Sequence, residues 1–195
     1  MTAVARKTLL LDLDNTLVLT TITYNGDVFG DLNFKLLEED GSYSEYCVVF
    51  RHYVQEFIRR CQIFYNVGIF TAAERDYADR ILDVLCPDVR LRFYSEDCKE
   101  GGHVKDLTAL RGIEFDPTSF LLFDDRAPDN TIPHENGMCC PSFMHSEEQE
   151  HALQIFADVL CDERFHGVPD IRVPLSKYEQ VRQNRMKSQQ PNRTW

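Results

Sequence analysis

The sequence contains 195 residues, of which 43% are hydrophobic and 11% aromatic, and its formal net charge is −11. These values are typical of one globular domain and exclude an intrinsically disordered chain. The negative charge would repel a phosphate backbone, so no nucleic-acid partner is expected.

The cysteines indicate a reducing compartment. There are seven, an odd number, and no C-x-x-C pair occurs, which argues against a zinc site. No secretory signal precedes them, so we expect reduced thiols in a soluble cytoplasmic or nuclear protein. The apolar run Leu9 to Leu11 is too short to cross a bilayer, and no membrane anchor is expected. The oligomeric state stays open.

The first predicted element is a buried strand at Thr8–Leu11, which is short, apolar and followed by polar residues. Residues 22–50 differ in character. They contain two hairpin signals, Asn25-Gly26 and Asp40-Gly41, among stretches rich in β-forming residues. We therefore expect a small antiparallel β insert at about residues 22–50.

Helices and strands alternate after the insert. Apolar residues at helical spacing predict one helix from about Tyr53 to Cys61 and another from Tyr77 to Leu85. A capping box at Ser146–Gln149 opens a further helix. Short apolar runs predict three more strands, at Val67–Phe70, Leu91–Tyr94 and Ser119–Phe123. This alternation predicts an α/β fold whose parallel sheet is covered on both faces.

The last segment, residues 176–195, has a different composition from the rest. It lacks apolar periodicity and holds five basic residues and one acid. We expect a polar basic tail that is solvated or frayed, following a single domain at residues 1–175. A tail that binds a partner is the alternative.

Two pairs of acids carry the first chemical signal. Asp12 and Asp14 follow the first predicted strand, and Asp124 and Asp125 follow another. In open α/β sheets, ligands bind beyond the carboxyl ends of the strands, so these carboxylates are expected to converge there. Four converging carboxylates repel one another unless a cation lies between them. Oxygen ligands of this kind favour Mg²⁺ as the cofactor.

Two further residues fit a phosphate site. Thr71 follows the predicted strand Val67–Phe70, where its hydroxyl can donate to a phosphate oxygen. Lys105 precedes a short apolar helix at about Asp106–Leu110, and its charge would offset that of a phosphate. Each residue alone is weak support, since a threonine is often a helix cap and a lysine usually lies at the surface.

The order of these motifs resembles the haloacid dehalogenase superfamily of aspartate-based phosphatases. The segment Leu10–Val18 resembles the opening of its FCP/SCP-like (NLI-interacting factor-like) phosphatases, which act on the RNA polymerase II C-terminal domain and related phosphoproteins. The resemblance runs from about Leu9 to Leu160 and includes further stretches at Phe70–Ala73, Tyr94–Cys98, Val104–Leu107 and Leu122–Asp125. Arg51-His52 and Arg126 depart from the usual Arg-Pro and Ser of the family.

The resemblance implies a role for each residue. Asp12 would be the nucleophile, and Asp14 would protonate the leaving oxygen and then activate water. Asp12, the main-chain carbonyl of Asp14, and Asp125 would hold Mg²⁺. Two further catalytic residues would be Thr71, which binds phosphate, and Lys105, which offsets charge. Thr16 would brace the loop and Asp124 would orient its neighbours and Lys105, both in supporting roles.

The resemblance also implies a substrate pocket in the insert for a proline beside the phosphoserine. Six apolar or aromatic residues are candidates for its lining: Tyr24, Val28, Phe29, Leu32, Phe34 and Val48. The alternative is that they form the insert's own small core. The expected substrate is a phosphorylated protein or peptide, because an insert this short leaves the site open.

Two other functions remain alternatives. One is a phosphatase for a small phosphorylated metabolite, and the other is a non-catalytic binding module of the same fold. The acids at Asp12, Asp14, Asp124 and Asp125, together with Lys105, favour the enzyme over the module.

Overall fold

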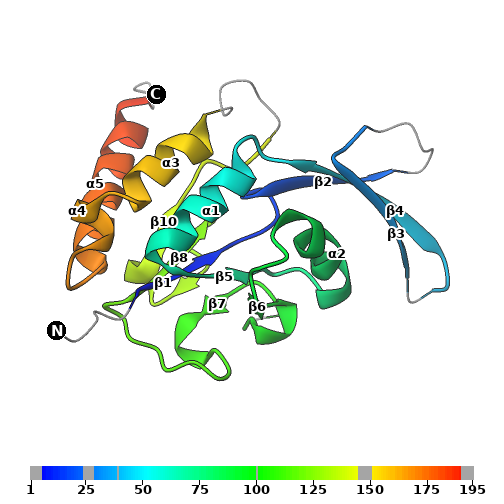
Figure 1. Cartoon of the computed structure of the whole chain (residues 1–195), viewed down its shortest axis with the longest axis horizontal. Helices are drawn as coiled ribbons and strands as arrows, with labels where there is room; N and C mark the ends of the chain where they lie inside the picture. Colours follow the sequence, from blue (N-terminus) through cyan, green and yellow to red (C-terminus); the bar gives the residue numbers. More distant parts are fainter. Residues whose placement is uncertain (1–5, 24–28, 39, 100, 145–150, 190–195) are drawn as a thin grey trace, which may run out of the picture.

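A five-stranded parallel sheet forms the centre of the protein (Figure 1). The computed structural model describes residues 6–23, 29–38, 40–99, 101–144 and 151–189. The strand order is β10-β8-β1-β5-β6. Their bounds are β1 (Thr8–Leu11), β5 (Asn66–Phe70), β6 (Leu91–Phe93), β8 (Phe120–Asp124) and β10 (Gly137–Cys139). The parallel sheet of the predicted α/β fold is therefore confirmed.

Strand β1 lies in the middle of this sheet because its side chains are apolar on both faces. Leu9, Leu10 and Leu11 are all fully buried. Leu9 pairs with Val67 of β5 on one side and with Leu121 of β8 on the other. A continuous apolar run is typical of a central parallel strand. Its carboxyl end fixes the position of the residues that follow it.

The two faces of the sheet are covered differently. One hydrophobic cluster joins the sheet to the helices α1 (Val54–Phe64), α2 (Arg75–Leu85) and α3 (Ala152–Leu160). The opposite face carries a smaller cluster, built with Leu107 and Leu110. Its cover includes the single-turn 3₁₀ helix η2 (Leu107–Ala109), and another such turn, η1 (Ser95–Asp97), follows β6. The helix expected at Asp106–Leu110 is thus a 3₁₀ turn between extended residues.

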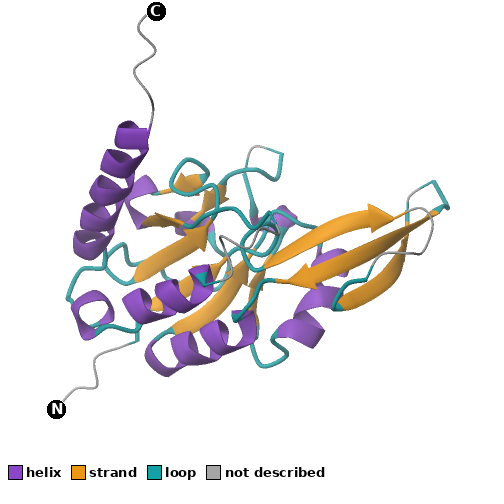
Figure 2. Ribbon diagram, turned by 90° about the horizontal axis from the view of Figure 1, so that it is seen from above, coloured by secondary structure: helices purple, strands orange, loops and turns teal. Residues whose placement is uncertain are grey.

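The insert is a separate antiparallel sheet that projects from the main body (Figure 2). Its order is β2-β4-β3, formed by β2 (Val18–Thr23), β4 (Tyr43–Phe50) and β3 (Leu32–Leu37). The predicted Asp40-Gly41 turn lies between β3 and β4, and Gly41 has φ 82°, which glycine adopts without strain. The Asn25-Gly26 signal lies outside the described residues. Strand β2 begins at Val18, before the predicted insert.

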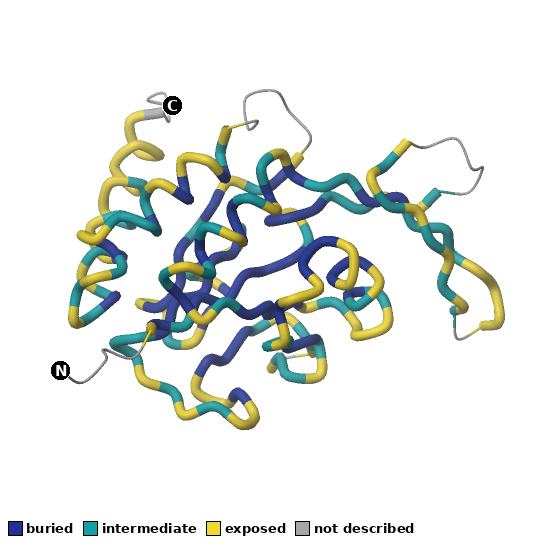
Figure 3. Tube along the Cα trace, in the orientation of Figure 1, coloured by how far each residue is buried: buried dark blue, intermediate teal, exposed yellow. Residues whose placement is uncertain are grey.

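The C-terminal segment is helical where a frayed tail was expected. A short helix α4 (Glu163–His166) precedes α5 (Arg172–Gln189). Leu175 of α5 is buried, and the Tyr178 hydroxyl donates to the Cys139 carbonyl at 2.6 Å. These contacts fix the first turns of α5, whereas its later turns are mostly exposed (Figure 3). The predicted capping box at 146–149 lies outside the described residues.

Smaller elements complete the fold beside the sheet. A two-stranded parallel ladder pairs β7 (Lys105–Asp106) with β9 (Thr131–Ile132), and η3 (His134–Asn136) follows β9. No helix in the described part of the chain combines the length and apolar character that crossing a membrane requires.

Candidate active site

The predicted polar residues meet in one cavity at the carboxyl edge of the parallel sheet. The cavity measures about 280 Å³. Asp12 follows β1, Thr71 follows β5, and Asp124 ends β8. Lys105 reaches the same place from β7, outside the main sheet. The lining residues are Asp12, Asp14, Asn15, Thr71, Ala72, Ala73, His103, Lys105, Asp124, Asp125, Arg126 and Asn130.

Asp12 is held from both sides. The Lys105 ammonium group donates to Asp12 Oδ1 at 2.5 Å, and the Thr16 hydroxyl donates to Asp12 Oδ2 at 2.9 Å. Thr16 Oγ1 also accepts the backbone N–H of Asp125 at 3.1 Å. Thr16 therefore joins the loop after β1 to the loop after β8, and the Asp12 carboxylate has a fixed orientation.

Asp124 holds the lysine from the other side. Its Oδ2 accepts from Lys105 Nζ at 2.6 Å and from Asn130 Nδ2 at 3.0 Å, while Oδ1 accepts the backbone N–H of Arg126 at 2.7 Å. Lys105 and Asp124 are both about 1% exposed. A buried charge pair of this kind needs such hydrogen bonds to offset the cost of its desolvation.

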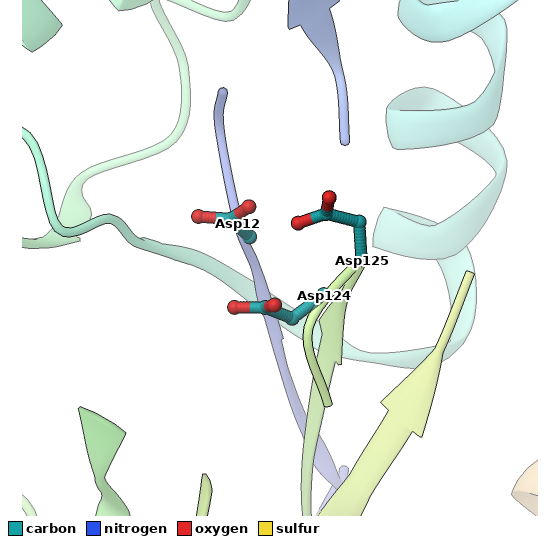
Figure 4. Close-up of side chains that lie close together, drawn as sticks. All are labelled: Asp12, Asp124 and Asp125. Atoms are coloured by element: carbon teal, nitrogen blue, oxygen red, sulfur yellow. The ribbon is translucent and has the colours of Figure 1, made fainter. Parts of the chain in front are cut away.

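Three carboxylates offer a site for a divalent cation. One oxygen each of Asp12, Asp124 and Asp125 lie within 4.8 Å of one another, and Figure 4 shows the three side chains converging from the ends of two strands. Hard oxygen donors of this kind fit Mg²⁺, which is bound by one or two carboxylates plus water and phosphate. The residues present therefore fit the predicted cofactor.

The pKa values of the clustered aspartates also favour a bound cation. Burial raises the pKa of Asp12 to about 7, against the opposing effect of Lys105, and nearby Asp124 adds to the rise. Burial also raises the pKa values of Asp14 and Asp125. Lys105 and other hydrogen-bond donors outweigh burial at Asp124, whose pKa is lowered. A cation would stabilise the charged forms that burial opposes.

Thr71 and Asp14 face the same cavity. Thr71 is buried, and its Oγ1 accepts the backbone N–H of Ala73 at 3.0 Å, so its own hydroxyl hydrogen can be donated into the cavity. Asp14 Oδ1 accepts from the Tyr77 hydroxyl at 2.6 Å. The structure thus brings together all seven residues predicted for the catalytic, metal and supporting roles.

The predicted pocket residues that the structure describes do not gather at the site. A groove of about 790 Å³ runs from Asp14 between α2 and the insert, and none of the four candidates that the structure describes lines it. Val48 is fully buried in the main core, and Leu32 and Phe34 pack against it. Phe29 is 98% exposed, and Tyr24 and Val28 lie outside the described residues. The larger apolar and aromatic residues that line the groove are Ile22, Leu36, Leu37, Tyr43, Tyr46 and Tyr77.

Sequence reasoning missed three residues that shape the site. Asn130 holds Asp124, Tyr77 holds Asp14, and the buried Arg51 donates to the Thr16 carbonyl at 2.9 Å. Asn130 belongs to no predicted element. Tyr77 was predicted on the packed face of its helix, in a stretch that resembles the second motif of the family, without a role at the site. Only the fold shows which polar atoms they meet.

The fold and the arrangement of the site residues together define the class of protein. A parallel sheet with acids after β1 and β8, a threonine after β5 and a lysine beside them is the arrangement of the haloacid dehalogenase class. A model of the NLI interacting factor-like phosphatase family matches residues 7–172. The chain belongs to this family, and the resemblance drawn from its motifs is confirmed.

Several named relatives are similar to this chain. It is 30% identical over 174 residues to the human carboxy-terminal domain RNA polymerase II polypeptide A small phosphatase 2, covering 86% of this chain and 60% of that protein. It is 32% identical over 162 residues to the Saccharomyces cerevisiae phosphatase PSR1, covering 80% and 36%. A probable C-terminal domain small phosphatase of Dictyostelium discoideum is 30% identical over 181 residues, covering 89% and 55%. The chain thus spans between 36% and 60% of the length of these relatives.

Solved structures support the fold alone. The fission yeast RNA polymerase II CTD phosphatase Fcp1, in a variant bound to beryllium fluoride, is 21% identical with a TM-score of 0.61. The match covers 90% of this chain and 55% of that one. A structural similarity at this low sequence identity shows a shared fold and gives no information about the reaction.

Proposed function

We propose that this protein is a magnesium-dependent phosphatase that removes phosphate from phosphoserine or phosphothreonine in proteins through a phospho-aspartate on Asp12. The observation that carries the proposal is the Asp12 carboxylate, fixed by Lys105 and Thr16 inside a cavity that Thr71 and Asp14 also line. Membership of a phosphatase family supports the reaction class.

The first step forms the intermediate. An Asp12 carboxylate oxygen attacks phosphorus, and the bond from phosphorus to the substrate oxygen breaks. Asp14 gives its proton to that leaving oxygen, so that a neutral alcohol departs. Lys105 and Thr71 stabilise negative charge on the phosphoryl oxygens by fixed positive charge and by hydrogen bonding.

The second step restores the enzyme. Asp14, now ionised, takes a proton from a water molecule, whose oxygen attacks phosphorus. The bond between phosphorus and Asp12 breaks, and inorganic phosphate leaves. Mg²⁺ held by Asp12, the Asp14 carbonyl and Asp125 would offset the negative charge of the phosphoryl group.

The groove beside Asp14 supports a polypeptide substrate. It is open and lies between α2 and the insert, next to the cavity that holds Asp12. Its apolar and aromatic lining suits a proline ring following the phosphoserine, and one candidate substrate is the RNA polymerase II C-terminal domain named in the human relative. A phosphatase for small metabolites would not need this extended groove.

The direct test replaces the nucleophile. Asp12→Asn is nearly isosteric, so the variant should keep its circular dichroism spectrum and lose turnover of a phosphoserine peptide in the presence of Mg²⁺. Asp88→Asn changes an exposed acid that does not line the cavity, so it is the matched control and should keep full activity. Retention of more than a few per cent of kcat by Asp12→Asn would rule out the covalent route.

A further inference from the structure

Tyr77 connects the insert to the site through its hydroxyl group. The Tyr77 oxygen lies 2.6 Å from Asp14 Oδ1 and 2.6 Å from Thr20 Oγ1. Tyr77 belongs to α2, and Thr20 belongs to β2 of the insert. Asp14 lines both the cavity that holds Asp12 and the groove, whereas Tyr77 lines only the groove. The hydroxyl therefore stands where the two spaces join.

The direction of these hydrogen bonds follows from the chemistry of the groups. An ionised carboxylate only accepts, and a phenol has one hydrogen to give. Tyr77 must therefore donate to Asp14, and the Thr20 hydroxyl donates to the Tyr77 oxygen. With Oδ1 of Asp14 occupied in this way, Oδ2 is the oxygen that can carry a proton to and from the reacting groups.

The ring of Tyr77 is itself held by aromatic residues of the insert. Phe34 and Tyr46 stack on each other with ring centroids 5.4 Å apart and an interplanar angle of 16°. The Tyr77 ring lies 5.3 Å from Tyr46 and 6.0 Å from Phe34, tilted against both. Contacts at these distances are favourable for aromatic pairs. The insert thus fixes the ring, and the ring fixes the hydroxyl on Asp14.

We propose that Tyr77 is a positioning residue that aims the Asp14 carboxyl group at the leaving oxygen, and that the insert contributes to the reaction through it. This inference rests on the proposed function, in which Asp14 is the general acid. General acid catalysis contributes about 10²–10⁴-fold to a reaction, and it depends on close alignment of donor and acceptor. Loss of the Tyr77 hydroxyl should remove part of that factor.

The readout is the dependence of the rate on the leaving group. The oxygen of a phosphoserine leaves poorly unless it is protonated, whereas p-nitrophenolate leaves without a proton. Tyr77→Phe keeps the ring and removes the hydroxyl. We expect kcat/KM to fall ~10-fold or more for a phosphoserine peptide and less than ~3-fold for p-nitrophenyl phosphate. Thr20→Val removes a hydroxyl that contacts the Tyr77 oxygen and also bonds to Asp14, so the ratio of the two kcat/KM values should change in the same direction.

The chain offers a matched control. The Tyr94 hydroxyl also donates to an aspartate, Asp79 of the same helix α2, at 2.7 Å, but neither residue lines the cavity or the groove. Tyr94→Phe removes an equivalent hydrogen bond and should leave the ratio of the two kcat/KM values unchanged. Thermal unfolding of the variants shows whether each is folded at the assay temperature.

The outcomes separate this inference from the proposed function. Equal losses for both substrates in Tyr77→Phe, or no loss for either, would overturn the positioning role. Asp14→Asn serves as the reference, because it should show the leaving-group effect in full. If Asp12→Asn is inactive and Asp14→Asn discriminates between the substrates but Tyr77→Phe does not, only this inference fails. Turnover by Asp12→Asn would instead refute the proposed function.

Discussion

Lys105 is the residue on which the charge balance of the site depends. Its ammonium group lies between Asp12 and Asp124, 2.5 Å and 2.6 Å from their oxygens, and all three side chains are buried. Burial alone would lower the pKa of Lys105, but the two carboxylates outweigh it and raise that pKa. The lysine therefore stays charged and offsets charge that would otherwise be unpaired.

Replacing this lysine should destabilise the protein. Lys105→Met leaves two buried carboxylates without their cation, and breaking such a pair typically costs about 3–5 kcal/mol. Urea unfolding without metal measures the loss of free energy of unfolding. Lys177→Met removes an exposed lysine and should change it by less than about 0.5 kcal/mol. A similar stability for both variants would contradict the assigned role of Lys105.

Asp106, the neighbour of Lys105, gives the protein a pH-dependent contribution. Burial works to raise its pKa, but an ion pair with Lys99 and hydrogen bonds from the Thr108 N–H and hydroxyl lower it overall. A carboxyl whose folded-state pKa lies below its unfolded value stabilises the fold above that unfolded value. The contribution is lost as the pH falls through the lower, folded-state pKa.

We therefore expect Asp106→Asn to unfold at lower urea concentration than the native protein at about pH 7. The difference in unfolding free energy should shrink as the pH is lowered from about 5 to about 3, where the native carboxyl takes up its proton. Urea titrations at several pH values measure it. A difference that stays constant over this range would show that Asp106 acts only through its shape.

At the scale of elements, the sequence predicted both the main parallel sheet and the small antiparallel insert, but not the residues that line the groove between the insert and α2. Apolar runs identified β1, β5 and β8 because a strand buried on both faces leaves little choice of residue. The polar residues directly after them were then predictable as a group. Lys105 was also found, although it comes from a short ladder and not from the main sheet.

The groove was not predictable because it depends on how two elements dock. Phe34 pairs with Tyr46 across the insert, and both rings meet Tyr77 of α2. Which residues of β3 face the groove follows from this packing and not from their hydrophobicity. The sequence analysis predicted Phe34 and Val48 as pocket residues. In the structure Val48 belongs to the hydrophobic core and Phe34 packs against that core.

The groove leads to a prediction about substrate choice. A peptide with phosphoserine followed by proline should react faster than the same peptide with alanine. Burying the proline ring against Tyr43 and Tyr46 would contribute about 1–2 kcal/mol at ~25 cal/mol per Å², or roughly ten-fold in kcat/KM. Proline also loses less backbone entropy on binding. The two peptides are compared at one ionic strength.

A groove variant supplies the control for this comparison. Tyr43→Ala removes an exposed ring from the groove and should reduce the preference for proline without changing turnover of p-nitrophenyl phosphate. Equal kcat/KM values for the two peptides with the native protein would contradict a proline site in the groove. The contact of the insert with Tyr77 would then be its remaining role at the site.

At the scale of the whole molecule, the fold places acids from distant parts of the chain at one point. Asp12 and Asp125 are separated by more than a hundred residues, yet each offers an oxygen to the same cluster. In a protein with net charge −11, such a cluster is unfavourable unless a cation is bound. Metal binding should therefore support both activity and stability.

Removing the metal tests this dependence. Dialysis against EDTA should abolish turnover, and Mg²⁺ should restore it. Because Mg²⁺ binds only the folded protein, it should also raise the unfolding free energy, by about 2.7 kcal/mol at a hundred times Kd. Asp125→Asn should reduce this stabilisation. Full activity in excess EDTA would refute the metal requirement.

The central claim is that phosphate passes through Asp12, and trapping the intermediate tests it most directly. The protein is mixed with a phosphoserine peptide and Mg²⁺, quenched in acid during turnover and treated with borohydride, which reduces an acyl phosphate to an alcohol. Peptide mass spectrometry should then find homoserine in place of Asp12, and none in Asp12→Asn. Homoserine at a different aspartate, or no reduced residue despite steady turnover, would contradict the account.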